Sequence, residues 1–326
     1  MTETNVYESK TVFVTGASGI VGSSLVRELL AQRAAVVALL RDESPNSELM
    51  RSGDYRRITC VRGSLEQPDV LERALVEYEV DAIFHLGAQT QVRHAQRHPF
   101  GTLEANVRGT YNLLEVVRRL DRPAEALVIA SSDKAYGDSE DLPYTEAHPL
   151  AGRNIYDASK SAADMLASAY AESYSLPVGI ARCGNIYGGG DLNWDRIVPG
   201  TIRSLMRGQR PIIRSDGTPS RDYLFVDDAV SAYLLLGASL MRGLEHGEAF
   251  NFGHGEPVAV LDLVSEIIEV VGRHDLPPEI LSESPNEIQA QWLDASKAKS
   301  RLRWTPAFTL RSGLERTVEW YLELLR

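Results

Sequence analysis

The segment Thr11–Gly22 reads TVFVTGASGIVG, and its pattern decides the fold class of the chain. The β-branched run Thr11–Thr15 predicts a strand, and Ile20–Gln32 predicts an amphipathic helix that begins shortly after it. Three glycines fill this turn, where they allow a tight bend and a close approach of the backbone to a ligand. The helix N-terminus then favours a negative charge on that ligand. The segment therefore predicts a turn that holds a dinucleotide pyrophosphate; a glycine-rich turn that binds nothing is the less favoured interpretation.

Short apolar runs alternate with amphipathic stretches through the first half of the chain. The further predicted strands are Ala35–Leu40, Ile58–Val61, Asp81–Leu86, Ala126–Ser131 and Val178–Arg182. The further predicted helices lie near Pro68–Tyr78, Phe100–Arg119 and Asp157–Tyr174. Continuously apolar strands are typical of strands buried on both faces. The repeated units predict an α/β fold, a doubly wound parallel sheet of the Rossmann type with helices on both sides.

The alternation of predicted strands and helices becomes irregular after Cys183, where glycine and proline are frequent in GNIYGGGDLNWDRIVPG (184–200). We predict a dinucleotide-binding domain over residues 1–183, with about 223–253 packing back on it. Residues 184–222 and 254–326 form a smaller C-terminal lobe that binds the substrate in this interpretation. Because ligands of such sheets bind beyond the carboxyl ends of the strands, the cleft between the two parts is the expected site.

The composition excludes several classes of partner. A net charge of −11 would repel a polyanion, so we expect no nucleic-acid partner. The sequence has no run of about 18 apolar residues, and its polar first ten residues lack a signal-peptide pattern, so we expect no membrane partner. Cys60 and Cys183 follow apolar stretches and predict free buried thiols, which fits a cytoplasmic protein. The seven histidines show no metal-ligand spacing, so we expect no metal.

Tyr156 and Lys160 lie four residues apart in YDASK at the start of a predicted helix, and therefore on one face of it. An unperturbed phenol has a pKa of about 10, too high for a base at neutral pH. We expect the neighbouring ammonium and the positive end of the helix to lower the pKa of Tyr156. Ser132, which follows the strand ALVIAS, supplies a third hydrogen-bonding group. The spacing alone is common on protein surfaces, but beside the glycine turn it predicts a catalytic tyrosine.

The end of the second predicted strand bears on the identity of the dinucleotide. It reads Leu40-Arg41-Asp42. An acidic residue at this point accepts hydrogen bonds from the adenosine 2′-hydroxyl of NAD, and Asp42 could do so one position late. Arg41 could pair with the 2′-phosphate of NADP or remain a solvated surface side chain. NAD is the expected cofactor, and Arg41 leaves NADP open.

Five motifs occur in the order in which the extended short-chain dehydrogenase/reductase family carries them. They are GASGIVG at Gly16–Gly22, HLGA at His85–Ala88, NVRGT from Asn106, SSDKAYG from Ser131 and YDASK from Tyr156. Over nearly its whole length the chain resembles the nucleotide-sugar epimerase and dehydratase branch of that family. The resemblance implies that a tyrosine deprotonates the sugar 4-hydroxyl while sugar C4 gives a hydride to the nicotinamide.

The resemblance also implies the role of each site residue. Tyr156 would take the proton of the 4-hydroxyl, Lys160 would hold the nicotinamide ribose, and Ser132 would bind the 4-oxygen. Asn106 would support the site structurally. The implied cofactor-binding residues are Gly16, Ser18, Gly19, Ile20, Val21, Gly22, Arg41, Asp42, Ala88, Asn106, Tyr156 and Lys160.

The residues after Ser132 bear on the branch of the family. They are Asp133-Lys134, where epimerases usually carry small or hydroxyl residues and many dehydratases carry Asp-Glu. This pair and GGGDLNWDRIVPG (188–200) resemble CDP-glucose 4,6-dehydratases. Asp133 would then protonate the leaving hydroxyl. Lys134 would remove the C5 proton or hold Asp133 in place, and a lysine that only reaches solvent is the alternative.

A second motif indicates other subgroups of the family. The segment RDYLFVDD, Arg221–Asp228, resembles epimerases and other dehydratases. The expected function is conversion of an NDP-hexose to an NDP-4-keto-6-deoxyhexose by a 4,6-dehydratase, through transient oxidation at C4. A 4-epimerase on the same scaffold is the alternative. A catalytically silent dinucleotide-binding protein is a third and less favoured interpretation, because Tyr156, Lys160 and Ser132 are all present.

The expected partner is a nucleotide-diphosphate sugar, whose phosphates suit the planar donors of arginine. The candidate substrate-binding residues, strongest first, are Asn185 in the family's R-x-G-N pattern, Arg221, Arg196, Arg214, and Gln89 with Arg93. The resemblance also implies a homodimer that pairs through the helices near Phe100–Arg119 and Asp157–Tyr174.

Overall fold

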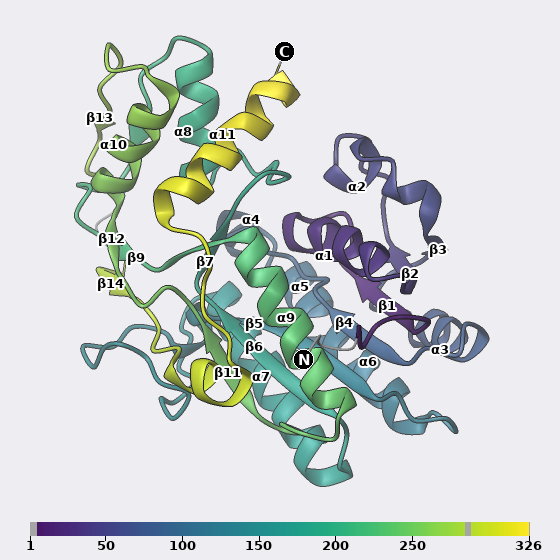
Figure 1. Cartoon of the computed structure of the whole chain (residues 1–326). Helices are drawn as coiled ribbons and strands as arrows, with labels where there is room; N and C mark the ends of the chain where they lie inside the picture. The colour runs from purple at the N-terminus through teal and green to yellow at the C-terminus, as the bar shows by residue number, and fades with distance from the viewer. Residues whose placement is uncertain (1–4, 284–287, 326) are drawn as a thin grey trace.

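A seven-stranded parallel sheet forms the centre of the computed structural model, which describes residues 5–283 and 288–325 (Figure 1). Its strand order is β11-β6-β5-β4-β1-β2-β3. The strands are β1 Thr11–Thr15, β2 Ala35–Leu40, β3 Thr59–Arg62, β4 Ala82–His85, β5 Ala126–Ser132, β6 Val178–Cys183 and β11 Ala249–Phe252. Strand β1 pairs with both β2 and β4, so the order reverses there and leaves a crevice beyond the carboxyl ends of these strands.

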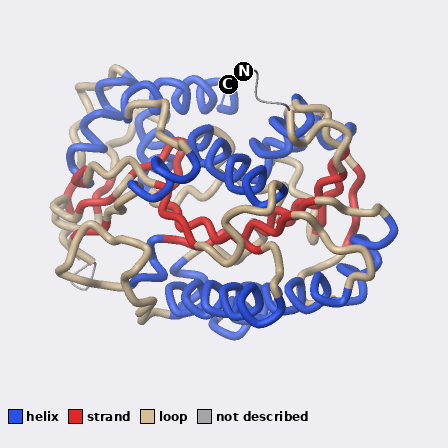
Figure 2. Tube along the Cα trace, turned by 60° about the horizontal axis from the view of Figure 1, so that its bottom comes forward, coloured by secondary structure: helices blue, strands red, loops and turns tan. Residues whose placement is uncertain are grey.

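Helices cover both faces of this sheet, which Figure 2 shows as a middle layer. Helices α1 Ile20–Ala31 and α9 Val226–Met241 pack on one face. Helices α3 Pro68–Glu77, α6 Gly109–Arg119 and α7 Ile155–Tyr174 pack on the other. The predicted doubly wound sheet is confirmed.

The strands feed both cores because successive side chains point to opposite faces. Val12 and Val14 of β1 pack in the core that contains Leu25 of α1. Phe13, between them, packs in the core that contains Leu113 of α6. Burial on both faces explains why the strands are continuously apolar rather than alternating.

A smaller lobe has a core of its own beside the carboxyl ends of the strands (Figure 1). Ile202, Leu263 and Leu314 are fully buried in it and come from three different helices. Its helices are α8 Ile197–Met206, α10 Val260–Val271 and α11 Leu310–Leu325. Its short strands are β7 Asn185–Tyr187, β8 Ile212–Ile213, β9 Ser220–Arg221, β10 Tyr223–Phe225, β12 Val258–Ala259, β13 Glu279–Ile280 and β14 Ala290–Gln291.

The chain returns to the first domain through α9 and β11. Strand β11 lies at the edge of the main sheet beside β6. Strand β10 instead pairs with β7, and its residues are divided between cores, with Tyr223 and Phe225 in the lobe and Leu224 against the sheet. Segment 223–225 therefore joins the two parts, and the domain limits stay a prediction.

The remaining helical segments are short. They are α2 Glu48–Arg51, α4 Val92–Arg97, α5 Pro99–Leu103, the 3₁₀ helices Asp54–Arg57 and Asp133–Tyr136, and the π turns Glu104–Arg108 and Ala298–Leu302. The stretch predicted as a helix near Phe100–Arg119 is thus α5, a π turn and α6 in succession. A π turn inside a helix often marks a functional site, and this one contains Asn106.

Candidate active site

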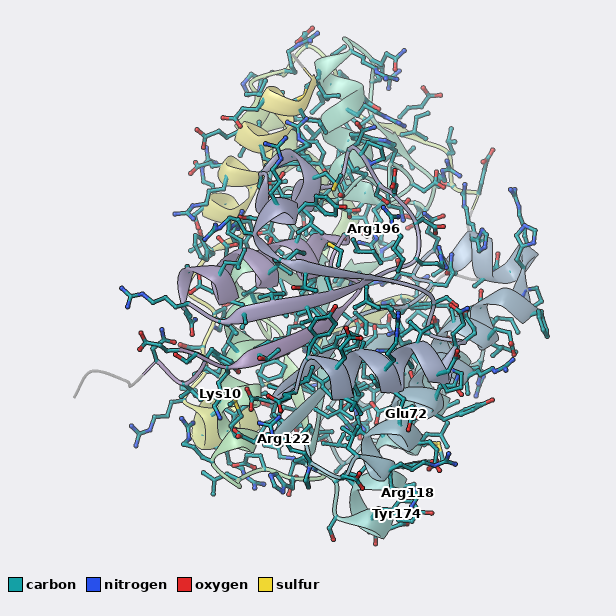
Figure 3. The ribbon with its side chains drawn as sticks, turned by 90° about the vertical axis from the view of Figure 1, so that its right-hand side faces the viewer. Lys10, Glu72, Arg118, Arg122, Tyr174 and Arg196 are labelled. Atoms are coloured by element: carbon teal, nitrogen blue, oxygen red, sulfur yellow. The ribbon has the colours of Figure 1, made fainter. Side chains whose placement is uncertain are left out.

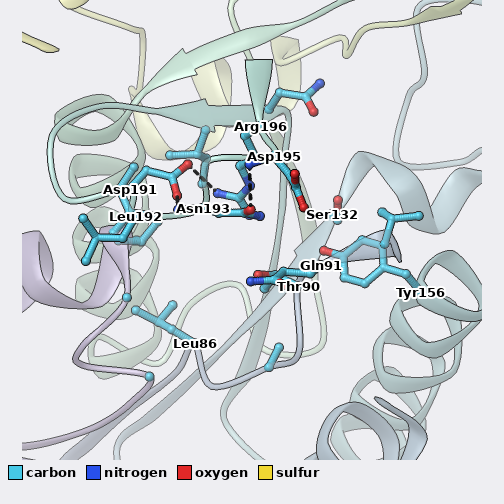
Figure 4. A pocket seen from close by; sticks show the side chains of 18 of the residues that line it. Leu86, Thr90, Gln91, Ser132, Tyr156, Asp191, Leu192, Asn193, Asp195 and Arg196 are labelled. Carbon is cyan, nitrogen blue, oxygen red and sulfur yellow. Dashed lines mark hydrogen bonds and ion pairs between the residues drawn. The ribbon is translucent and has the colours of Figure 1, made fainter. Parts of the chain in front are cut away.

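A pocket of about 1350 Å³ opens where the main sheet meets the lobe (Figure 4). It is lined by the glycine turn, by residues beyond β4, β5 and β6, and by the segment 190–204 of the lobe. A pocket for one small ligand encloses about 300–1,000 Å³. This one is larger, so it has room for a dinucleotide and a second ligand.

The glycine turn leaves no space for side chains. Gly16 has a φ of +73°, and a Cβ there would lie 2.8 Å from the backbone nitrogen of Gly87. A Cβ on Gly22 would lie 2.0 Å from the carbonyl oxygen of Gly16. Gly19 is the N-cap of α1, so the free backbone N–H groups of the helix face the pocket. Ser18, Ile20 and Val21 line the pocket beside these glycines.

Arg41 and Asp42 line the pocket beyond the end of β2. Arg41 Nε donates to Asp42 Oδ2 over 2.6 Å, and both side chains are exposed. The guanidinium is thus already paired with a carboxylate. That carboxylate also lies where a 2′-phosphate of NADP would have to bind in this interpretation, and like charges would repel.

Tyr156, Lys160 and Ser132 are brought together in the same pocket. Tyr156 and Lys160 come from the first turns of α7, and Ser132 ends β5. Lys160 Nζ donates to the carbonyl oxygen of Ala130 over 2.9 Å. In Figure 4 the Tyr156 hydroxyl points toward Ser132. The geometry can present a phenol and a serine hydroxyl to one oxygen of a ligand.

The expectation that Lys160 lowers the pKa of Tyr156 is corrected by the structure. Burial raises the pKa of Tyr156 to about 12, and the opposing effects come from Arg196 and from the hydrogen bond with Ser132. Burial also lowers the pKa of Lys160 to about 8. The positive charge on Lys160, which was expected to lower the pKa of Tyr156, is therefore itself disfavoured by burial. The desolvation of the phenol has the larger effect on the pKa of Tyr156.

Asp133 and Lys134 begin the 3₁₀ helix that follows Ser132. Asp133 is 1% exposed, and Lys134 Nζ lies 3.5 Å from its Oδ2. Ser132 Oγ donates to Asp133 Oδ1 over 3.0 Å, and Lys134 Nζ also donates to Gln291 Oε1. Burial lowers the pKa of Lys134 although Asp133 opposes this. The lysine therefore points into the site rather than to solvent.

Asn106 and Gln89 lie behind the pocket surface. Asn106 Nδ2 donates to the carbonyl oxygen of Gln89 and to Ser159 Oγ, and Asn106 Oδ1 accepts from the Gln89 backbone N–H. The Gln89 side chain accepts from the Gln91 backbone N–H, so Thr90 and Gln91 line the pocket in its place. Asn106 thus holds the loop after β4, beside the lining residue Ala88, and contacts other protein groups instead of facing the cavity.

The other predicted substrate-binding residues come from the lobe and from α4. They are Asn185, Arg196, Arg221, Arg214 and Arg93, and all of them line the pocket. Arg196 Nη1 donates to Asp191 Oδ2 over 3.0 Å. Arg221 is buried and donates to the carbonyl oxygen of Ser220. Asn185 Nδ2 is buried and has no hydrogen-bond partner within residues 5–283 and 288–325. An unsatisfied buried donor in a pocket indicates a place for an acceptor of a ligand.

Sequence reasoning missed several lining residues. Gln291, Trp194 and Asp157 line the pocket, and none of them was predicted as a site residue. Gln291 is 157 positions from Lys134, which it contacts, so no local spacing could have found it. Asp157 lies inside the quoted motif YDASK, and a carboxyl group next to Tyr156 was a signal that could have been used.

Residues 5–283 and 288–325 contain neither a candidate metal site nor a membrane-spanning helix. No three His, Cys, Asp or Glu side chains are grouped so that they could hold a metal ion. No helix there is long and apolar enough to cross a membrane.

The chain is similar in sequence to known 4,6-dehydratases, which agrees with the geometry of the site. A family model described as GDP-mannose 4,6 dehydratase matches residues 13–317. The CDP-glucose 4,6-dehydratase of Salmonella typhimurium is 31% identical to the chain over an alignment that covers 100% of the chain and 94% of that protein.

Solved structures give the same architecture. The UDP-glucose 4-epimerase of Thermotoga maritima, with UDP-glucose, has a TM-score of 0.88 and 27% identity and covers 97% of this chain and 100% of its own. The dTDP-glucose 4,6-dehydratase of Bacillus anthracis, in complex with NAD, has a TM-score of 0.85 and 27% identity and covers 97% of each chain. The similarity thus extends through both the sheet and the lobe.

Proposed function

The chain belongs to the GDP-mannose 4,6-dehydratase family of nucleotide-sugar-modifying enzymes, and from this premise we propose that it is a nucleotide-sugar 4,6-dehydratase. It would convert an NDP-hexose to an NDP-4-keto-6-deoxyhexose, a net loss of one water. Bound NAD would accept the hydride of sugar C4 and later return it to C6. The family membership confirms the resemblance to nucleotide-sugar epimerases and dehydratases.

One observation carries the dehydratase assignment. Asp133 and Lys134 are paired in the pocket directly beside Ser132 and Tyr156. Expulsion of the C6 hydroxyl needs an acid at the leaving oxygen and a base at C5, whereas epimerisation at C4 needs neither. A buried carboxyl–amine pair beside the phenol supplies both groups.

The roles of the chain's own residues follow from their positions. Tyr156 receives the proton of the 4-hydroxyl, Ser132 lies beside the 4-oxygen, and Lys160 holds the nicotinamide ribose. Asp133 protonates the leaving oxygen, and Lys134 accepts the C5 proton once it is neutral, a form that its burial favours. Each group acts at an atom within the same cavity.

The pocket fits NAD. The two glycines that exclude a Cβ, Gly16 and Gly22, leave the N-terminus of α1 open to a pyrophosphate. Asp42 accepts from Arg41 and remains able to accept from a ribose hydroxyl. A 2′-phosphate would meet the Asp42 carboxylate, so NAD is favoured over NADP. The similar dehydratase of Bacillus anthracis was solved with NAD.

The diphosphate of the sugar nucleotide would bind between the sheet and the lobe. Asn185 offers an unused buried donor there. Arg221, Arg196 and Arg93 add positive charge around the same cavity, which suits two phosphates. The sugar would then lie toward Ser132.

A second function, 4-epimerisation of a nucleotide sugar, is favoured by two observations. The segment Arg221–Asp228 resembles epimerases as well as other dehydratases, and the UDP-glucose 4-epimerase structure has a TM-score of 0.88 to this chain. The same Tyr156 and Ser132 would serve its C4 chemistry. This alternative leaves Asp133 and Lys134 without a chemical role.

One assay separates the two functions. Purified protein is incubated with CDP-glucose, dTDP-glucose, UDP-glucose, UDP-glucuronate and GDP-mannose, and the products are examined by mass spectrometry. Loss of one water from one of them supports the dehydratase, and an unchanged mass with a new sugar isomer supports the epimerase. Tyr156→Phe should lose turnover but keep dinucleotide binding, which removes the silent-protein interpretation. Wild-type turnover in that variant would contradict the role of the phenol.

The chain would act as a cytoplasmic homodimer. Exposed apolar side chains gather on α5, α6 and α7, among them Phe100, which is 76% exposed, Tyr111 and Met165. Arg118 lies over the Tyr174 ring at the end of this surface (Figure 3). Phe100→Glu should shift the sedimentation coefficient from dimer to monomer; a wild-type protein that sediments as a monomer at micromolar concentration would contradict the proposal.

A further inference from the structure

The hydroxyl of Ser132 lies between the two groups that move protons at opposite ends of the reaction. Its hydrogen points to Asp133 Oδ1, 3.0 Å away, and in Figure 4 the Tyr156 hydroxyl points toward Ser132. The backbone N–H of Lys134 donates to the same Ser132 oxygen over 3.2 Å. This N–H contact fixes the hydroxyl, because it occupies one lone pair and leaves the other toward Tyr156. The three side chains therefore form a chain from phenol to serine to carboxylate.

The proton balance of a dehydration matches this chain. Oxidation at C4 breaks the O4–H bond and releases one proton at Tyr156. Expulsion of O6 as water consumes one proton at Asp133. The C5 proton is removed by Lys134 and returned to C5, and the C4 hydride is returned to C6. The only net transfer left inside the protein is one proton from Tyr156 to Asp133.

We propose that Ser132 carries this proton, so that C4 oxidation protonates Asp133, the acid that later expels O6 as water. As O4 gives its proton to the phenol oxygen, the phenol gives its own to Ser132, and Ser132 gives its own to Asp133. Tyr156 and Ser132 end the step as they began it, and Asp133 ends it protonated. Water loss then returns Asp133 to the carboxylate. The inference rests on the proposed dehydratase function and adds to it a coupling between its two halves.

Two further observations agree with the relay. Tyr156, whose pKa burial raises to about 12, is almost entirely a neutral phenol at pH 7.5, and the relay lets it accept a proton without a standing phenolate. Asp133 is 1% exposed, so its proton is supplied more directly through Ser132 than from bulk water. Lys134 Nζ lies 3.5 Å from Asp133 Oδ2, so the proposed acid and the proposed C5 base are neighbours at the end of the relay.

The test follows C4 oxidation alone. A single turnover with the substrate identified by mass spectrometry is monitored at 340 nm, where the reduced cofactor absorbs. If Asp133 is the final proton acceptor, Asp133→Asn and Ser132→Ala should each slow formation of the reduced cofactor at pH 7 by about a hundredfold. The double variant should be no slower than either single one, because both changes interrupt one path. Ser132→Thr keeps the hydroxyl and should retain most of the rate.

The pH dependence and a matched control complete the design. Raising the pH should recover C4 oxidation in Asp133→Asn and Ser132→Ala, because Tyr156 can then lose its proton to solvent. Asp141→Asn, on a side chain that is 89% exposed, should behave as wild type. Melting temperatures of all variants exclude a folding defect.

The outcomes are distinct. Three results would each overturn the relay: wild-type C4 oxidation in Asp133→Asn at pH 7, additive effects in the double variant, or a loss of rate that high pH does not recover. The dehydratase assignment would stand in each case if the wild-type protein still releases water. A wild-type protein that dehydrates none of the five sugar nucleotides overturns the proposed function and the relay together.

Discussion

Burial sets the state of the ionisable side chains around Tyr156 more than any single neighbouring charge does. It raises the pKa of Tyr156 to about 12 and lowers the pKa of Lys160 to about 8. It also lowers the pKa of His85 to about 3, so this histidine is neutral at pH 7. His85 Nδ1 and Nε2 contact the hydroxyls of Thr15 and Thr110, and it therefore serves as a neutral hydrogen-bonding link beneath the site.

Asp157 gives a prediction about stability at the scale of one residue. It is 2% exposed, its Oδ1 has no partner among the described residues, and burial raises its pKa from 3.8 to about 6. A carboxyl group whose folded-state pKa is raised contributes stability that is present at low pH and is lost as pH rises through about 6. Asp157→Asn should therefore stabilise the fold at pH 8, on the order of 2–3 kcal/mol for a shift of this size.

The measurement for Asp157 compares melting temperatures of wild type and Asp157→Asn at pH 4.5 and pH 8. The variant should gain several degrees at pH 8 and little at pH 4.5. The N-terminal cap of α7 is retained, because it is the backbone N–H of residue 157 that donates to Asn154 Oδ1, and the new amide can still accept from Asn154 Nδ2. Equal differences at the two pH values would show that the carboxyl group is not strained by its burial.

The site residues that sequence reasoning placed in the pocket belong to motifs with short spacing. Tyr156 and Lys160 share one helix face, Ser132 ends β5, and Asp133 follows it directly. Gln291 could not be found in this way, because only the tertiary fold brings β14 to Lys134. The pKa of Tyr156 was also beyond sequence reasoning, since desolvation depends on how much protein surrounds the phenol.

At the scale of elements, β1 to β6 were predicted to within one residue of their observed ends, whereas β11 was expected only as part of a segment that packs back on the first domain. These strands are buried on both faces and are therefore continuously apolar, a pattern that can be identified in the sequence alone. The two-residue strands of the lobe were not predicted, because a strand such as β8 or β13 is too short to show a period. The π turn Glu104–Arg108 was also missed, since its apolar pattern continues that of α5 and α6.

The start of α1 gives the prediction at this scale. A Cβ on Gly22 would lie 2.0 Å from the carbonyl oxygen of Gly16, so α1 cannot pack as close to the turn if a methyl group is present there. Gly22→Ala should push α1 away and weaken NAD binding by at least tenfold, measured by titration calorimetry. Gly101→Ala is the matched control, because nothing lies within 4 Å of the Cβ position there. Unchanged NAD affinity in Gly22→Ala would contradict a pyrophosphate site at this turn.

At the scale of the whole molecule, the C-terminal helix connects the two parts across the pocket. Trp320 Nε1 of α11 donates to Glu48 Oε2 of α2 over 2.8 Å, and the Arg51 guanidinium lies over the Trp320 ring. The next residue, Tyr321, donates to the carbonyl oxygen of Asp191, which in turn pairs with Arg196. One turn of α11 thus holds both α2 and the loop that carries Arg196.

This arrangement predicts that α11 controls how long the cofactor stays bound. The loop from Gly188 to Arg196 crosses the start of α1, since Gly190 packs between Glu48 and Ser23. A dinucleotide on the turn before α1 would therefore lie beneath a loop that packs against Trp320 at Gly189. A dehydratase reoxidises its cofactor in every cycle, so slow release is compatible with turnover. Trp320→Phe, which keeps an aromatic ring but loses the Glu48 hydrogen bond, should release NAD at least several times faster.

The dissociation of NAD can be followed by dilution of the loaded protein and separation of bound from free dinucleotide at set times. Glu48→Gln keeps an acceptor and should fall between wild type and Trp320→Phe, because the charge that strengthens the hydrogen bond is lost. Glu319→Gln changes the adjacent exposed position of α11 and should match wild type. If Trp320→Phe retains NAD as long as wild type does, the loop must be held by Tyr321 and Asp191 alone, and α11 would connect the two parts without closing the cofactor site.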